Sequence, residues 1–328
     1  MKISIIIPTL NEERYITSCL DSIFASPLNS YEIIVVDGGS EDKTLSIVRE
    51  YQSKYLNLKL LHNPKKFTPI SMNIGIKESN GEFIFIISAH AEYQDNYFSL
   101  LVEKIQQLGA NCVGGVLETE VKNKNRKSNS IKKILTHRFG VGNAEFRIGS
   151  EEIKEVDTVA FGCYTRDTFE KFGLYNEKLI RNQDIELNKR IINGGGSIYL
   201  IPFVKAIYYA RDNFNDLAKN NYENGKWNIL TAYYTKSFNS LSTRHFIPLL
   251  FILSVILPIV LIPLSKYLIY IAFGSFISYV SLILIVSISI QDKENSFIYS
   301  IFSFFVLHIS YGFGSLRGLL DVIREKYE

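Results

Sequence analysis

The sequence predicts an α/β fold with an open, mostly parallel central sheet, followed by C-terminal helices that cross a membrane. Short buried strands alternate with amphipathic helices near the N-terminus, polar residues follow the strand ends, and the last 83 residues contain three long uncharged runs. Only ten charged residues, five of each sign, lie from Phe246 onward, whereas the first 245 residues carry 59. The chain is therefore expected to be a charged, core-forming body with an apolar tail.

Strand and helix alternate with short connections through the first 87 residues. Ile3 to Ile7 is an unbroken run of mostly β-branched residues that stops at Pro8, which is typical of a buried parallel strand. Further strands are predicted over 32–36, 58–61 and 83–87, and apolar positions at helical spacing predict helices over 11–24, 44–55 and 70–78. Ligands of such sheets bind beyond the carboxyl ends of the strands, so the candidate site comprises 9–12, 37–40 and 88–90.

The tail has three uncharged or nearly uncharged runs, over 246–264, 267–290 and 297–316. A helix needs roughly 20 apolar residues to cross the hydrocarbon core, so each run can span a membrane. Three prolines in the first run would allow a kinked or re-entrant segment. Basic residues after the third run (Arg317, Arg324 and Lys326) favour a cytoplasmic C-terminus under the positive-inside rule. Two and three crossings both remain open.

Charge and cysteine content exclude several classes of protein. A net charge of +3, from 36 basic and 33 acidic residues, argues against broad nucleic-acid binding. The one basic run, 122–133, indicates a solvated loop or a face that touches phosphates or anionic lipid head groups. Three widely spaced cysteines (Cys19, Cys112 and Cys163) predict buried thiols and neither a disulfide framework nor a zinc site. The N-terminal apolar run is too short for a signal peptide, so the body is not expected to be exported.

The strand ends carry residues suited to a nucleotide, although neither a dinucleotide-binding fingerprint nor a P-loop motif is present. Pro-Thr-Leu-Asn-Glu follows the first strand and Asp-Gly-Gly-Ser ends the second. A carboxylate there can accept hydrogen bonds from a nucleobase or ribose, and the two glycines allow the backbone to approach a ligand. Asp37 alone is equally consistent with a turn residue that caps the following helix.

Segments 5–13 and 34–44 resemble the opening of family 2 glycosyltransferases of the GT-A fold. Later stretches resemble the succinoglycan-biosynthesis glucosyltransferase-like branch: Ser-Ala-His-Ala-Glu-Tyr, Val-Asp-Thr-Val-Ala-Phe-Gly-Cys-Tyr, Arg-Asn-Gln-Asp-Ile-Glu-Leu-Asn, Tyr-Glu-Asn-Gly-Lys-Trp and His-Ile-Ser-Tyr-Gly-Phe-Gly-Ser-Leu. The likeness covers nearly the whole chain. It implies a GT-A nucleotide-sugar-binding domain over 1–245, with a nucleotide half over about 1–95 and an acceptor half over about 96–245, and a membrane region over 246–328.

The resemblance also implies a donor site. Its nucleotide-binding positions correspond here to Pro8, Thr9, Glu12 and Asp37. The family's Asp-x-Asp, which binds the ribose and a divalent metal, is replaced by Ser88-Ala89-His90. His90 is the expected metal-side residue, and a neutral imidazole suits Mn²⁺ better than Mg²⁺. Without the motif, a lone histidine at a strand end would be read as a hydrogen-bonded structural residue.

The general base of the family is the Asp of a Glu-Asp pair, which corresponds to Gln183-Asp184. Asp184 would take the proton of the acceptor hydroxyl as that hydroxyl attacks the anomeric carbon; alternatively, it is only a first-turn helix carboxylate. Lys226 and Trp227 occupy the place of a polysaccharide-synthase signature. They are expected to stabilise the leaving diphosphate and to stack on the acceptor sugar, although Trp227 also suits a membrane-interface anchor.

The sequence thus predicts a multi-pass, membrane-anchored inverting glycosyltransferase at the cytoplasmic face of the cell membrane. It is expected to use a nucleotide sugar, in particular a UDP-sugar, and a lipid-linked glycan acceptor for an exopolysaccharide or surface polysaccharide. Membrane lipids are its other partner, and nucleic acid is not. Two alternatives remain: a polyprenyl-phosphate sugar transferase, and a nucleotide-sugar-binding subunit of a synthesis complex that is not itself an active enzyme.

Overall fold

The structure, a computed structural model, describes residues 2–236 and 242–327 and contains two compact units. The first, here called the α/β unit, consists of residues up to 119 together with 144–209. The second, here called the helical unit, consists of 120–143 and the residues from 210 onward. The helical unit thus contains the three apolar runs and also two segments that the sequence interpretation had assigned to the body.

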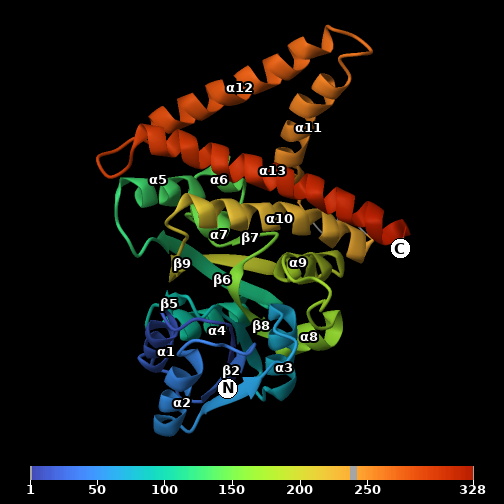
Figure 1. The fold of residues 1–328 in the computed structure, drawn as a ribbon. Helices are drawn as coiled ribbons and strands as arrows, with labels where there is room; N and C mark the ends of the chain where they lie inside the picture. The colour runs from blue at the N-terminus through green and yellow to red at the C-terminus, as the bar shows by residue number, and fades with distance from the viewer. Residues whose placement is uncertain (1, 237–241, 328) are drawn as a thin grey trace. The chain divides into compact units, whose positions relative to one another are not determined.

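The α/β unit follows the predicted alternation (Figure 1). Its elements are β1 (Ile3–Thr9), α1 (Ile16–Phe24), β2 (Tyr31–Asp37), α2 (Thr44–Lys54), β3 (Leu58–His62), α3 (Thr68–Glu78), β4 (Phe83–Ile86), β5 (Ala91–Tyr93), α4 (Tyr97–Leu108), β6 (Cys112–Glu120), α7 (Glu145–Ile148), β7 (Lys154–Glu155), β8 (Ala160–Thr165), α8 (Arg166–Phe172), α9 (Gln183–Asn193) and β9 (Ile198–Tyr209). The α/β prediction is confirmed. The first helix begins at Ile16 rather than at 11, because 10–15 form a loop at the strand end.

The described strands form one mixed sheet in the order β3-β2-β1-β4-β8-β6-β9-β5, with β7 paired to β9. The four strands predicted from the sequence pair in parallel, whereas β8 is antiparallel to both β4 and β6, and β9 to β5. The last residues of three parallel strands are in register, with Thr9 beside Asp37 and Asp37 beside His62. The carboxyl ends of these strands therefore meet at one edge of the sheet, as the sequence predicts.

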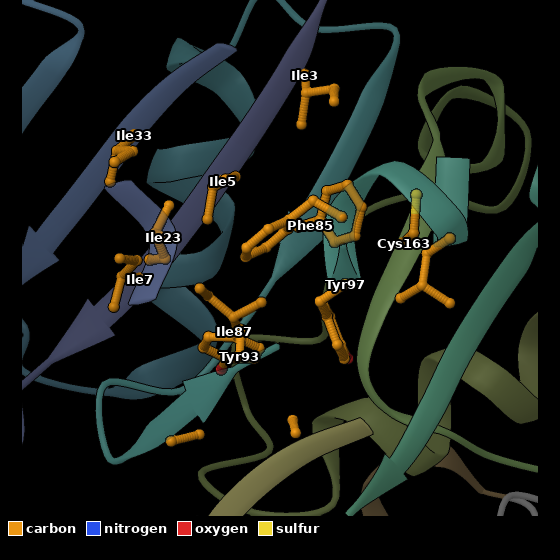
Figure 2. Close-up of a cluster of buried hydrophobic side chains, with 14 of the residues drawn as sticks. Ile3, Ile5, Ile7, Ile23, Ile33, Phe85, Ile87, Tyr93, Tyr97 and Cys163 are labelled. Carbon is orange, nitrogen blue, oxygen red and sulfur yellow. The ribbon is translucent and has the colours of Figure 1, made fainter. Parts of the chain in front are cut away.

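The core of the α/β unit explains why the strands are so apolar. Ile5, Ile7 and Phe85 from neighbouring strands are fully buried and belong to one apolar cluster with Tyr97 (Figure 2). Each such side chain contributes roughly 1.5–3 kcal/mol through its removal from water. The three cysteines are likewise buried and free, and burial raises the pKa of each thiol. The prediction of buried thiols is confirmed.

The helical unit consists, among the described residues, of α5 (Arg126–Leu135), α6 (Arg138–Val141), α10 (Phe214–Thr235), the 3-10 helix η2 (Thr243–Phe246), α11 (Ile247–Val260), α12 (Leu268–Ser289) and α13 (Phe297–Tyr327). Three of its helical segments are long and apolar enough to cross a membrane: Thr243–Val260, Leu268–Ser289 and Phe297–Glu325. The chain is therefore membrane-associated, as predicted. The third helix runs well past 316, where the uncharged run of the sequence ends.

One expectation is wrong. Most of the basic run predicted as a solvated loop is the helix α5. Asn125 begins this helix with a capping box, because its side-chain oxygen accepts hydrogen bonds from the backbone N–H groups of Lys127 and Ser128 while the Ser128 hydroxyl accepts one from the Asn125 N–H. Its apolar face is buried in a cluster with α12 and α13. The sequence interpretation gave weight to charge and missed this cap.

Candidate active site

Hydrogen bonds between the loops that follow β1 and β2 join the two strand ends. The Asn11 N–H donates to Ser40 Oγ over 2.8 Å, and the Glu41 N–H donates to Asn11 Oδ1 over 2.9 Å. The Glu12 N–H donates to Thr44 Oγ1 over 2.8 Å. Asn11 has a φ of 57°, a left-handed conformation that asparagine tolerates better than most residues. The candidate segments 9–12 and 37–40 include Asn11, Glu12 and Ser40, whereas Thr44, the first residue of α2, lies outside them.

Asp37 organises the second of these loops. Its side chain is buried, and its carboxylate accepts hydrogen bonds from the Gly39 N–H at 2.7 Å, the Ser40 N–H at 2.9 Å and Ser40 Oγ at 2.5 Å. This is the turn role that the sequence left open. Thr9 Oγ1 lies 3.5 Å from Asp37 Oδ1, and Pro8 is the preceding residue of β1. The predicted group is thus assembled at one strand edge, and nucleotide binding by it stays a prediction.

Glu12 and His90 form a pair at the same edge. Nδ1 of His90 lies 3.2 Å from Oε1 of Glu12, and their side chains are 25% and 19% exposed. The imidazole ring also packs edge-on against Tyr15 and near Tyr208, with centroid distances of 6.1 and 5.5 Å. The pair is held in place but reachable from solvent. Both the structural and the ligand-binding interpretation of His90 are therefore consistent with its surroundings.

The chemistry of these donors limits what metal they can hold. No group of three or more His, Cys, Asp or Glu side chains suited to a metal occurs anywhere in the described part of the chain. Glu12 and His90 offer one oxygen and one nitrogen, and Ser88 adds a hydroxyl whose Oγ accepts a 3.4 Å hydrogen bond from the His90 N–H. A divalent ion here would need further oxygens from the ligand that it helps to bind. The imidazole favours Mn²⁺ over Mg²⁺.

Asp184 lies in the first turn of α9. Partial burial raises the pKa of its carboxyl above the ordinary aspartate value, while a 2.9 Å hydrogen bond from the Ile185 N–H and the positive charge of Arg147 act in the opposite direction. The preceding Asn182 has a φ of 60° and supplies no side-chain cap. A carboxylate with a raised pKa is a better proton acceptor than an ordinary aspartate.

Gln183, next to Asp184, has a buried side-chain oxygen that lacks a hydrogen-bond partner among the described residues. Buried polar atoms in folded proteins are nearly always hydrogen-bonded to protein or water, so such an atom needs an explanation. A hydroxyl group of a bound sugar would satisfy it. This oxygen gives a physical reason for Gln183 to contact a bound ligand, and that contact stays a prediction.

Arg147 is a candidate that the sequence interpretation missed. Its guanidinium carbon lies 5.0 Å from the centre of the Tyr208 ring, and the same ring lies 5.5 Å from that of His90. The positive charge of Arg147 also acts to lower the pKa of Asp184. This residue therefore links the Glu12–His90 pair with the carboxylate on α9. It belongs to the four-residue helix α7, which has no motif that could have identified it.

Two of the later motifs, 156–164 and 181–188, contact each other in the α/β unit. Asn188 Nδ2 donates to Thr158 Oγ1 over 2.9 Å, and the Tyr164 hydroxyl donates to Asn188 Oδ1 over 3.2 Å. Between them, Phe161 has a φ of 52°, and its carbonyl accepts a hydrogen bond from the Tyr97 hydroxyl. A left-handed aromatic residue is strained, and such strain tends to occur at functional sites. The two hydrogen bonds of Asn188 therefore attach α9 to β8 and to the residue Thr158 just before it.

Lys226 and Trp227 belong to α10 of the helical unit, whereas the other candidates belong to the α/β unit. The Lys226 ammonium forms a 2.9 Å ion pair with Asp321, which also accepts from Arg317 Nε at 3.0 Å. The Trp227 ring lies 6.5 Å from that of Tyr234. The predicted contacts of Lys226 with a diphosphate and of Trp227 with a sugar remain predictions.

Comparisons with known proteins agree with this fold. The glycosyl transferase family 2 profile matches residues 4–169. A dolichyl N-acetyl-alpha-D-glucosaminyl phosphate 3-beta-D-2,3-diacetamido-2,3-dideoxy-beta-D-glucuronosyltransferase of Methanococcus voltae is 31% identical over 97% of both chains. The succinoglycan biosynthesis protein ExoA of Rhizobium meliloti is 27% identical over 63% of both chains.

Solved structures of glycosyltransferases have a similar fold. The mannosyltransferase PcManGT from Pyrobaculum calidifontis, in complex with GDP-Man and Mn²⁺, aligns with a TM-score of 0.60 at 15% identity, covering 97% of this chain and 87% of that one. Staphylococcus aureus TarS 1-349 with UDP-GlcNAc aligns with a TM-score of 0.52 at 16% identity, covering 99% and 92%. The family profile and the fold define a glycosyltransferase of the GT-A type. The chain belongs to glycosyl transferase family 2, as the sequence motifs indicated.

Proposed function

We propose that this protein is an inverting glycosyltransferase that moves a sugar from a UDP-sugar to a lipid-linked saccharide at the cytoplasmic face of the cell membrane. Its product would extend a surface polysaccharide or exopolysaccharide. The observation that carries the proposal is the position of Asp184, a first-turn carboxylate with a raised pKa. Beside it, the buried side-chain oxygen of Gln183 has no hydrogen-bond partner among the residues that the structure describes. This arrangement can accept a proton from an attacking hydroxyl while holding a second hydroxyl in place.

The donor would bind at the edge formed by Thr9, Glu12 and Asp37. Two hydrogen-bonded loops fix this edge, and a related fold has been solved with UDP-GlcNAc. The diphosphate carries negative charge, and the Arg147 guanidinium packs on Tyr208, the ring next to His90, while its charge acts on Asp184. We assign it the role of stabilising the charge that develops on the leaving diphosphate. Glu12 and His90 would hold a divalent ion, which would neutralise the same charge.

A lipid-linked saccharide is the acceptor that best fits the relatives and the apolar helices. The Methanococcus relative is named for transfer to a dolichyl-linked N-acetylglucosaminyl phosphate, which already carries a sugar. That name favours a saccharide hydroxyl as nucleophile over the bare phosphate of a polyprenyl phosphate. The three apolar helices would keep the enzyme at the membrane where such an acceptor lies.

A donor screen with purified full-length protein tests the proposal. UDP release would be measured for a set of UDP-sugars, with a lipid-linked saccharide or with polyprenyl phosphate as acceptor, in Mn²⁺, in Mg²⁺ and in chelator. We expect transfer to the lipid-linked saccharide, with Mn²⁺ at least as effective as Mg²⁺. Transfer to polyprenyl phosphate alone would assign the second candidate reaction, and tight UDP binding without transfer in every condition would identify a binding subunit.

Asp184→Asn with a matched control tests the role of the base. Asp167 is also a first-turn carboxylate, on α8, but is exposed. Asp167→Asn should therefore leave transfer unchanged, because it removes only a helix-dipole interaction. If Asp184→Asn transferred sugar at the rate of the parent protein, Asp184 would not be the base.

A further inference from the structure

The helices α10 and α13 lie side by side for their whole common length (Figure 1). Near their N-terminal ends the Phe214 ring lies 4.7 Å from that of Phe302. Near their C-terminal ends the Tyr234 hydroxyl donates to Glu325 over 2.7 Å. The two helices run in the same direction, so each turn of α10 lies beside a turn of α13.

Glycines allow these two helices to touch through their backbones. A Cβ atom at Gly314 would lie 1.9 Å from the Tyr222 carbonyl oxygen, and one at Gly225 would lie 1.9 Å from the Tyr311 carbonyl oxygen. Gly318, one turn further, faces the Lys226 carbonyl in the same way. This small-xxx-small spacing is one that membrane proteins use for close helix contact. The pair therefore behaves as one rigid element, and both helices must share one depth in the bilayer.

The partner helix α10 is too polar to cross a bilayer. It carries four charged residues and five asparagines within 22 positions: Asp216, Lys219, Glu223, Lys226, Asn215, Asn220, Asn221, Asn224 and Asn228. Charged residues are strongly disfavoured at the centre of a bilayer, where no water solvates them. Since α13 packs against α10 along the common length of the two helices, it cannot span the membrane unless α10 does. Its exposed face is apolar, which suits a helix lying in the plane of the interface.

Both ends of the α11–α12 hairpin are tied to the segment 120–143. At the start of the hairpin, Arg244 donates to the Asn143 carbonyl. At its end, Lys133 of α5 pairs with Asp292 at 2.7 Å, and the Ser296 N–H donates to Ser130 Oγ at 3.0 Å. The hairpin therefore begins and ends on the same side of the membrane. An even number of crossings follows.

The hairpin itself has the length and the surface of two membrane spans. Thr243–Val260 is 18 residues, about 27 Å of helix, and Leu268–Ser289 is 22 residues, about 33 Å, compared with roughly 30 Å of hydrocarbon. Its outward side chains are large and apolar, among them Leu257, Phe273 and Ile285. The bend between the helices carries one charged residue, Lys266.

We propose that the chain crosses the membrane twice, through the α11–α12 hairpin, and that α13 lies with α10 in the interface on the side of the α/β unit. The occupant of the exposed apolar face of α13 is thus a phospholipid bilayer. This topology leaves Arg317, Arg324 and the basic helix α5 on one side, which the positive-inside rule assigns to the cytoplasm. The inference rests on membrane association and is independent of the transferase reaction proposed above.

Cysteine labelling tests the topology in the full-length protein. The three native thiols are buried, so the parent protein provides the background. Four single-site variants would be exposed to a membrane-impermeant maleimide in sealed vesicles of each orientation: Ser53→Cys on α2, Ser265→Cys at the hairpin bend, Lys293→Cys between α12 and α13, and Arg324→Cys near the end of α13. Labelling in detergent confirms that each thiol can react.

We expect Ser53→Cys, Lys293→Cys and Arg324→Cys to label from one face and Ser265→Cys from the other. Labelling of Lys293→Cys and Arg324→Cys from opposite faces would show that α13 crosses, and would overturn the proposal. Labelling of Ser265→Cys from the same face as the others would show that the hairpin does not cross, and would also overturn it. Neither result would bear on sugar transfer, which the donor screen measures separately.

Spin labels on α13 provide a second measurement. Phe302, Phe313 and Leu320 are exposed and lie on one face of the helix. Labels at these three positions should report similar depths in lipid vesicles if α13 lies in the interface. A steady progression of depth from 302 to 320 would show a spanning helix and contradict the proposal.

Discussion

The imidazole of His90 and the carboxylate of Glu12 lie 3.2 Å apart, although 77 residues separate them in the chain. One follows β4 and the other follows β1, and these strands pair in parallel, so their carboxyl ends are neighbours. The pair provides a nitrogen and an oxygen donor, and His90 belongs to Ser88-Ala89-His90, the segment that the sequence resemblance aligns with the family's Asp-x-Asp. Its function as a metal or diphosphate contact is the first thing to test.

Glu12→Gln should weaken donor use because a neutral amide cannot hold a cation as a carboxylate does. A lost interaction with a charged group is worth roughly 1.5–3 kcal/mol, or about ten- to a hundredfold in kcat/KM for the donor. Glu13→Gln is the matched control, since Glu13 lies in the same loop but is exposed. Titration of activity with Mn²⁺ should show a higher metal requirement for Glu12→Gln only. Equal Mn²⁺ curves for the two variants would remove Glu12 from the site.

Asp184→Asn should lower kcat by about 10²–10⁴-fold, the usual contribution of a general base. The raised pKa of Asp184 should place the acid limb of the pH profile of kcat/KM above the ordinary aspartate range of about 3.9. Activity is lost below this limb because the protonated carboxyl cannot accept the acceptor proton. An acid limb that persisted unchanged in a slow Asp184→Asn variant would assign the titration to another group.

The same raised pKa has a consequence for stability. When the folded pKa of a carboxyl exceeds its unfolded value, the folded state holds the proton more tightly, so stability falls as pH rises from the unfolded to the folded pKa. At neutral pH the ionised Asp184 therefore lowers the free energy of unfolding. Asp184→Asn should unfold at a higher temperature than the parent at pH 7, and the difference should shrink in acid. A variant that is less stable at pH 7 would contradict this account.

Gln183→Glu should restore the acidic pair typical of the family and move the acid limb of activity to higher pH, since a second carboxylate disfavours ionisation of Asp184. Gln183→Met, which keeps the shape without a charge, is the matched control and should not move the limb. Because the Gln183 oxygen is buried and unpartnered among the described residues, Gln183→Met should also not destabilise the ligand-free protein. The pH profile and the unfolding temperature check both.

Arg147→Met should reduce turnover more than it reduces donor binding, because the leaving diphosphate gains charge in the transition state. Arg147→Lys should recover only part of the rate, since an ammonium lacks the planar group that stacks on Tyr208. Arg49→Met, an exposed change on α2, is the control for net charge. Steady-state kinetics of the three variants test the assignment, and an unchanged kcat for Arg147→Met would refute it.

Gly314→Leu should destabilise the helical unit, because its Cβ would collide with the Tyr222 carbonyl of α10. Overpacking of this kind typically costs about 1–3 kcal/mol. Gly274→Leu on α12 is the control, since nothing lies within 4 Å of a Cβ at that glycine. Thermal unfolding in detergent should separate the two variants. Equal stability would mean that α10 and α13 do not touch as closely as described.

Much of the α/β unit was predictable because buried parallel strands are local, nearly continuous apolar runs. Ile3–Ile7 and 32–36 were read correctly for this reason, and the residues after them followed from the rule for strand ends. The antiparallel strands after β4 escaped prediction, because β8 pairs with β4 across some 80 residues that carry little periodic signal. The helix α5 is hard to recognise from sequence because its basic residues are typical of a solvated loop, whereas its N-terminal cap is a short, local signal.

The sequence by itself determined the family, the first four strands, the position of Thr9, Glu12, Asp37 and Asp184 on the chain, and the presence of apolar helices. These are properties of local pattern and of motif order. Only the tertiary structure decided which side chains meet: Glu12 with His90, Arg147 with Tyr208, and Lys226 with Asp321. It also matched α13 to a polar helix that the tail's own hydropathy could not reveal. Hydropathy records how well each residue tolerates lipid, whereas depth in the membrane is set by the partner against which a helix packs.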